Sequence, residues 1–139
     1  MTTARDVMTV GCHCVSEDDS LTVAATAAAE HDIGALPVYG RDNVLKGMIT
    51  DRDIVVRCVA KGIDPKTMRV GDLAMRELVW VNADASIDEV AELMANHKIR
   101  RVPVMADGVL VGIISQADVA RRLPDKQVGG VVAAISDHQ

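Results

Sequence analysis

Two short segments of the 139-residue chain combine a glycine, a hydroxyl side chain and an aspartate at the same spacing. Both follow the pattern Gly-x-x-[Thr/Ser]-x-x-Asp, and their residues are Gly47, Thr50 and Asp53, then Gly112, Ser115 and Asp118. The spacing places the hydroxyl at the N-cap of a helix and the aspartate at its third residue, where backbone N–H groups and the helix dipole favour an anion. A carboxylate there can accept hydrogen bonds from two ribose hydroxyls. The upstream glycine lets a ligand approach the backbone.

The same residues also form an ordinary helix start, because Ser/Thr-x-x-Asp satisfies the first backbone N–H groups of a helix without any ligand. A single copy would favour that structural role. Two copies at matching places favour a binding role. The chain has no Gly-x-x-x-x-Gly-Lys-[Ser/Thr], His-Glu-x-x-His or Gly-x-Ser-x-Gly sequence. We therefore expect no catalytic residues and no enzyme.

The triplet Cys12-His13-Cys14 is the segment that most resembles a metal site. On an extended strand the two cysteines point to one side and the histidine to the other, so the three side chains do not converge. Two thiols alone fall short of the four ligands of a structural zinc site. We expect no metal site, and we expect thiols that are buried or unpaired, Cys58 included. A thiol redox sensor using these cysteines stays an alternative.

An internal repeat must position the two segments. Ile33–Val38 (IGALPV) corresponds to Ile99–Val104 (IRRVPV) at an offset of 66. Each copy is predicted as β-α-β-β-α, with capping serines at Ser20 and Ser86. The expected strands and helices are 14–15, 21–31, 35–39, 44–49 and 50–62, then 78–82, 87–97, 101–105, 109–114 and 115–123. A short helical piece precedes each copy, at Ala4–Met8 and Val70–Met75.

These elements divide the chain into a first repeat (4–62), a linker (63–69), a second repeat (70–123) and a tail (124–139). Gly129 and Gly130 weaken any helix in the tail, while its apolar residues favour docking or a partner contact. The sequence thus indicates an α+β fold, similar to an α/β sandwich, made of two repeats.

Composition excludes several classes of protein. The net charge of −5 disfavours a nucleic-acid surface, and 1% aromatic residues removes the stacking platform of single-strand binders. No apolar run of about 18 residues predicts a membrane span. The N-terminus does not resemble a signal peptide. We expect a cytoplasmic protein with an aliphatic core.

The duplicated Ile-x-x-apolar-Pro-Val strand, the hairpin after it and the Gly-x-x-[Thr/Ser]-x-x-Asp helix start together resemble a tandem pair of cystathionine-β-synthase (CBS) domains, often called a Bateman module. The resemblance covers roughly residues 4 to 123 and is closest to small stand-alone actinobacterial CBS-pair proteins. It implies two β-α-β-β-α repeats packed about a pseudo-twofold axis. It also implies a non-catalytic regulatory module that binds AMP, ADP, ATP or S-adenosylmethionine in the clefts between the repeats. No other cofactor is implied.

Carried onto this sequence, the resemblance implies ribose and phosphate contacts by Thr50 and Asp53 in one site and by Ser115 and Asp118 in the other. Arg100 and Arg101 occupy a place where basic residues of the family contact phosphate, whereas the first repeat has Gly34 and Ala35. The second site is therefore expected to bind better, unless these arginines are only a solvated pair. Adenine would lie among aliphatic side chains, for which the candidates are Val15, Ile33 and Leu36.

The resemblance also implies a homodimer, formed by the last helix of each repeat through apolar residues that a lone pair leaves partly open. These are Ile54, Val55, Cys58 and Val59, then Val119, Ala120 and Leu123. Because no effector domain is present in the sequence, a signal would pass to a separate partner protein. The alternative is a stress-response interaction protein whose clefts stay empty.

Overall fold

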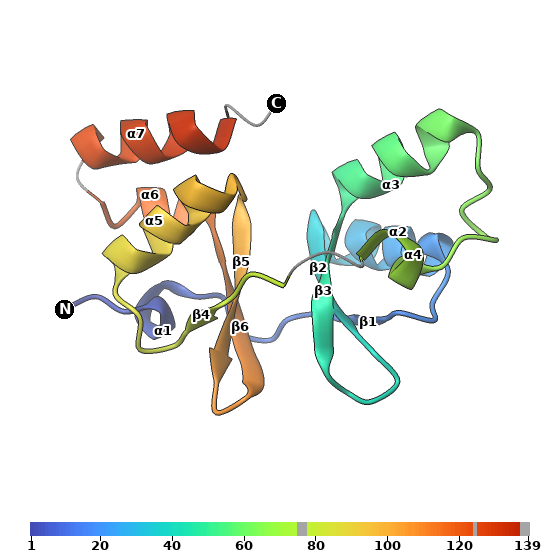
Figure 1. Cartoon of the computed structure of the whole chain (residues 1–139), viewed down its shortest axis with the longest axis horizontal. Helices are drawn as coiled ribbons and strands as arrows, with labels where there is room; N and C mark the ends of the chain where they lie inside the picture. Colours follow the sequence, from blue (N-terminus) through green and yellow to red (C-terminus); the bar gives the residue numbers. More distant parts are fainter. Residues whose placement is uncertain (75–77, 124, 137–139) are drawn as a thin grey trace. The chain divides into compact units, whose positions relative to one another are not determined.

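The computed structural model describes residues 1–74, 78–123 and 125–136. It divides into two compact units (Figure 1). The first-repeat unit comprises Cys12–Leu78, and the second-repeat unit comprises Met1–Gly11 together with Val79–Gln139. Within the described residues, no helix combines the length and the apolar character needed to cross a membrane.

The first-repeat unit is built on a three-stranded mixed sheet. Strand β1 (Val15–Ser16) runs parallel to β2 (Ala35–Tyr39), which pairs antiparallel with β3 (Leu45–Thr50). Helix α2 (Leu21–His31) follows β1, and α3 (Asp51–Arg57) follows β3 directly and continues into a 3-10 turn, η1 (Val59–Lys61). The core is aliphatic, with fully buried Leu21, Val38 and Ile49.

The second-repeat unit has the same topology. Strand β4 (Val81–Asn82) runs parallel to β5 (Arg101–Ala106), which pairs antiparallel with β6 (Val109–Ser115). Helix α5 (Ile87–His97) precedes β5, and α6 (Gln116–Ala120) follows β6. The two mixed sheets with their helices confirm the expected α+β fold of duplicated repeats. Several elements are shorter than predicted, α3 above all, which ends at Arg57, and α6, which ends at Ala120.

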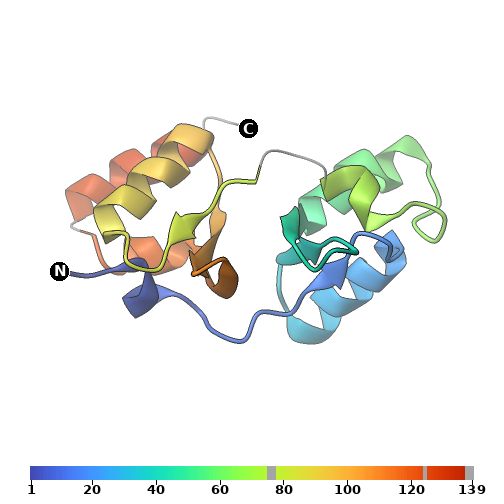
Figure 2. The ribbon, with the colours of Figure 1, turned by 60° about the horizontal axis from the view of Figure 1, so that its bottom comes forward.

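The helix that completes each unit comes from the segment that precedes the other repeat (Figure 2). Helix α1 (Ala4–Val7) packs in the second-repeat unit, where Ala4 N donates to Ala85 O at 2.8 Å and Thr9 N donates to Ile113 O at 2.8 Å. Helix α4 (Val70–Ala74) packs in the first-repeat unit, where Val70 N donates to Asp19 O at 2.8 Å. The compact units therefore differ from the repeats that are visible along the sequence.

The tail forms a helix, α7 (Asp125–Ser136), that contacts α5 and α6. Ile135 is 1% exposed, and Val131 packs against the same core. The prediction that Val119 and Leu123 stay partly open is therefore wrong, since α7 covers them. In the first-repeat unit Ile54 and Cys58 are also buried, because they face the core. Of the residues expected to stay open, only Val55 and Val59 are largely exposed, at 56% and 57%.

Replacing Gly129 and Gly130 with alanine is expected to raise the free energy of unfolding of the second-repeat unit by about 1 kcal/mol for each residue. Both lie inside α7, and a Cβ atom at either position would meet nothing within 4 Å. Alanine therefore gains helix propensity without a clash. Denaturant unfolding measures the change.

Gly11 provides the matched control in the same unit. Its surroundings are equally open, but its φ of +79° lies in the left-handed region. Gly11→Ala is therefore expected to destabilise the unit. Stabilisation by Gly11→Ala as large as that of the α7 variants would contradict a helix-propensity effect.

Candidate functional site

The junction between β3 and α3 holds the first predicted pair, Thr50 and Asp53. Thr50 is the N-cap, in extended conformation with φ −116° and ψ 158°. Asp53 N donates to Thr50 Oγ1 at 3.1 Å, and Thr50 N donates to Asp53 Oδ2 at 3.0 Å. The two hydrogen bonds form a reciprocal capping box. They hold the carboxylate in a fixed position at the start of the helix.

The junction between β6 and α6 repeats this arrangement. Asp118 N donates to Ser115 Oγ at 3.2 Å, and Ser115 N donates to Asp118 Oδ2 at 2.8 Å. Arg101 is the register partner of Ser115, and Gln116 N donates to Arg100 O at 2.7 Å. The sheet thus brings both predicted arginines to the residues that start α6.

A third capping box lies at the start of α1, where no ligand site is predicted. Thr3 and Asp6 start α1 in the same way, with Thr3 N donating to Asp6 Oδ2 at 2.9 Å. The hydrogen bonds from the Thr3 backbone and side chain hold the pKa of Asp6 below its usual value. Because this box lies outside the two predicted sites, the local geometry alone does not distinguish a cap from a ligand site.

Arg121 is a residue that the sequence analysis missed. Its Nη2 atom forms an ion pair with Asp118 Oδ1, the carboxylate oxygen that the capping box does not use. Asp118 is 9% exposed, whereas the side chain of Arg121 is 69% exposed. The spacing Asp-x-x-Arg on a helix could have revealed the pair. Val56 stands at the equivalent position of the first repeat, so the two sites differ in local charge.

The structure places the residues proposed for the adenine slot in or against the core of the first-repeat unit. Val15 and Leu36 are 6% and 2% exposed and belong to the buried cluster. Ile33 is half-buried and packs against that cluster. Ile33 thus has more surface to offer a ligand than the other two.

The upstream glycine of each segment was expected to let a ligand approach the backbone. At Gly112 the structure shows protein atoms in that space instead. A Cβ atom there would lie 2.6 Å from Met8 Sδ and 2.9 Å from Thr9 O. The segment after α1 therefore fills the space beside Gly112. Close packing of the chain, rather than access for a ligand, explains this glycine.

Among the residues that the structure describes, the cysteines and histidines form no group suited to a metal ion. The ring of His13 stacks on that of His31, with centroids 3.4 Å apart and planes 9° apart, so their nitrogens do not converge on one point. Across residues 1–74, 78–123 and 125–136, no group of three or more His, Cys, Asp or Glu is suited to a metal ion. The three cysteines, all inside these ranges, form no disulfide.

Alkylation of Cys12 and Cys14 by iodoacetamide is expected to be slow near neutral pH. Burial raises the pKa of both thiols, and the neighbouring Cys12 further raises the pKa of Cys14. A smaller fraction of each cysteine is then present as the reactive thiolate. The alkylation rate should therefore keep rising above about pH 9. Mass spectrometry after timed quenching follows each residue.

Cys12→Ser is the informative comparison, since it removes the neighbour and should lower the pKa of Cys14 toward its usual value. A rate at neutral pH faster than that of free cysteine would instead favour a redox sensor.

A family model accounts for both repeats. The model of the CBS domain matches residues 4–59 and again residues 70–125. The chain belongs to the CBS domain family. The two Gly-x-x-[Thr/Ser]-x-x-Asp segments therefore lie at equivalent places in two CBS domains, and the protein is a tandem CBS protein.

The relatives of this tandem CBS protein include proteins of similar length. Hypoxic response protein 1 of Mycobacterium tuberculosis (strain ATCC 25618 / H37Rv) is 50% identical over 135 residues, which cover 97% of this chain and 94% of the relative. A crystal structure of hypoxic response protein I with two coordinated zinc ions is 52% identical, with a TM-score of 0.78. That match covers 88% of this chain and 100% of the solved one.

A third relative is the hexameric CBS-CP12 protein from bloom-forming cyanobacteria. It is 33% identical with a TM-score of 0.80, over 88% of this chain and 72% of the solved one. This CBS protein of related structure is thus a hexamer.

Proposed function

We propose that this tandem CBS protein is a non-catalytic regulatory module that binds an adenosine ligand. The ligand class is AMP, ADP, ATP or S-adenosylmethionine. The observation that carries the proposal is the duplicated capping aspartate. One carboxylate oxygen of Asp53 accepts a hydrogen bond from Thr50 N, and one of Asp118 accepts a hydrogen bond from Ser115 N. The capping box thus fixes each carboxylate before a ligand binds. Binding of a ribose diol then costs little further ordering of the side chain.

The second repeat is the better site for a phosphorylated ligand. Arg100 and Arg101 lie beside the start of α6, and Arg121 reaches the carboxylate of Asp118. Arginine binds phosphate oxygens through several N–H groups at once. At the equivalent positions of the first repeat, Gly34, Ala35 and Val56 supply no charge. We therefore infer two sites of unequal affinity.

Calorimetric titration with AMP, ADP, ATP and S-adenosylmethionine tests the proposal. The expected result is binding with two unequal steps for a phosphorylated ligand. Absence of binding by all four ligands would reject a nucleotide module and would favour the alternative, an interaction protein of a stress response. The Arg121–Asp118 pair lends weight to this alternative, because it satisfies Asp118 without a ligand.

We also propose that the chain associates with a second copy of itself and acts in the cytoplasm. Val55 and Val59 give the first-repeat unit an exposed apolar surface, which supports self-association of this chain as a homodimer. The output then passes to a separate effector protein in the cytoplasm. Sedimentation velocity that shows a single 14.8 kDa species at micromolar concentration would reject the dimer.

A further inference from the structure

The two units have equivalent helix surfaces. Among the described residues, a further helix covers this surface in the second-repeat unit only. In the second-repeat unit, α7 lies beside α5 and contacts α6 (Figures 1 and 2). We call the surface formed by α5, α6 and Leu123 beneath α7 the seat; Val119 and Leu123 belong to it and are 1% and 8% exposed. In the first-repeat unit, Val55 is equivalent to Ala120 of the seat, and it is 56% exposed. Among the described residues of that unit, no helix corresponds to α7.

Helix α7 depends on the seat for its stability. Gly129 and Gly130 stand in its interior, and their surroundings leave room for side chains. Packing therefore does not require glycine at these positions. A helix of 12 residues with two interior glycines forms poorly without tertiary contacts. Its folding and its docking are consequently one reversible event.

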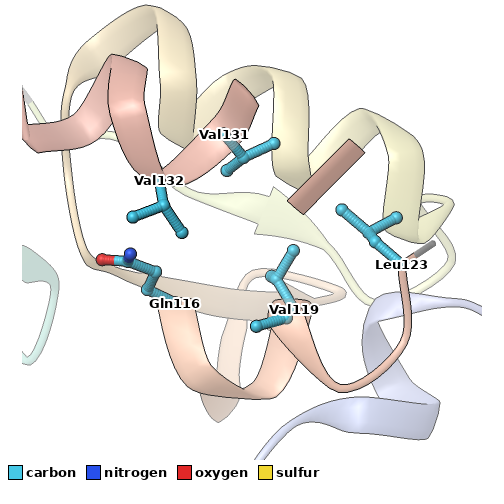
Figure 3. Close-up of a pocket in the computed structure, with 6 residues that line it drawn as sticks. Gln116, Val119, Leu123, Val131 and Val132 are labelled. Carbon is cyan, nitrogen blue, oxygen red and sulfur yellow. The ribbon is translucent and has the colours of Figure 1, made fainter. Parts of the chain in front are cut away.

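The contact between α7 and the seat is mainly apolar. A small pocket between α6 and α7 has no room for a water molecule (Figure 3). Its lining comprises Gln116, Val119, Ala120, Leu123, Val131 and Val132. Burial of apolar side chains is non-directional, so the seat accepts other aliphatic side chains of similar size.

The exposed residues of the first-repeat unit repeat the pattern that α7 presents to the seat. α7 has Val131, Val132 and Ile135, and the segment of α3 and η1 has Val55, Val56 and Val59. Both sets have the spacing i, i+1, i+4, and the second set is 44–57% exposed. A second copy of this chain therefore carries exposed valines at the same sequence spacing as the aliphatic residues of α7, although the non-helical Cys58 separates Val56 from Val59.

We propose that α7 is a detachable cap that competes with a second copy of the chain for the seat. When α7 leaves, α3 and η1 of another molecule dock on α5 and α6 through Val55, Val56 and Val59. The proposal rests on the self-association proposed above and adds its regulation. Assembly then increases when α7 is released and decreases when α7 is held in place.

Variants of the full-length chain test the cap in both directions by sedimentation velocity. Gly129→Ala with Gly130→Ala favours docked α7 and is expected to weaken self-association at least tenfold. Because these substitutions do not disturb the core, this variant is expected to fold. Ile135→Asp releases α7 and is expected to strengthen self-association by a similar factor. Adding Val55→Asp and Val59→Asp to it should abolish that gain.

The outcomes separate the cap from the proposed dimer. If the wild-type chain stays monomeric, the proposed homodimer fails, and Ile135→Asp still tests the cap, because assembly that depends on Val55 and Val59 would support it. An unchanged dissociation constant in the double alanine variant of a dimeric chain overturns the cap. So does an Ile135→Asp protein, folded by circular dichroism, that either stays monomeric or associates without needing Val55 and Val59.

Discussion

Replacing Asp53 or Asp118 with alanine is expected to weaken binding of an adenosine ligand at its own repeat by about tenfold to a hundredfold. Each carboxylate would accept hydrogen bonds from ribose, and a hydrogen bond to a charged group contributes about 1.5–3 kcal/mol. The other repeat should bind as before. Titration calorimetry on each variant measures the loss, and the double variant should show neither binding step.

The control for this prediction is Asp6→Ala. It removes the same kind of capping box from α1 and leaves both predicted sites untouched. All three variants should lose about 1 kcal/mol of stability, since each loses a helix cap. If Asp6→Ala reduced affinity as much as the other two, general destabilisation would explain the effect and the ribose role would be rejected.

Leu36→Ala is expected to lower the free energy of unfolding of the first-repeat unit by about 2–5 kcal/mol. Leu36 is 2% exposed and belongs to the buried cluster beneath β2 and α2. Removing its isobutyl group leaves a cavity in an aliphatic core. Urea unfolding measures the change. Under conditions where the variant is folded, its affinity for an adenosine ligand should stay within about twofold.

Val44→Ala is the matched control in the same unit. Val44 is 52% exposed, so its truncation should change stability by less than about 0.5 kcal/mol. If Leu36→Ala proved equally mild, the core role of Leu36 would be wrong. A large loss of affinity in the folded variant would instead return Leu36 to the adenine slot.

Local signals predicted the parts of the fold that local physics determines. Ser20 and Ser86 cap α2 and α5 as expected, because their hydroxyls accept from Val23 N and Glu89 N. Asp107 and Gly108 form the predicted turn, both with positive φ. Caps and turns depend on a few adjacent residues, so a single sequence contains the information that they require.

Contacts between distant segments were not predictable in the same way. The placement of α1 beside β6 depends on pairing between Thr9 and Ile113, for which no local pattern exists. The tail was expected to dock or to meet a partner, and α7 does dock, although its glycines disfavour a helix. Burial of Ile135 and its neighbours outweighs that propensity. The Asp118–Arg121 spacing was visible in the sequence. It was one of several possible pair spacings on a short helix, so the spacing alone did not single out this ion pair.

The exchanged helices α1 and α4 also set an order of events during synthesis. The first-repeat unit is contiguous, so all of its residues have been made once the ribosome reaches Leu78. Met1–Gly11, although synthesised earlier, hydrogen-bonds with Ala83, Ala85 and Ile113, which are made later. One unit can thus fold while the nascent chain is still growing, whereas the other must wait for β6. A ribosome that stalls after Leu78 would leave a folded unit preceded by a segment whose partners do not yet exist.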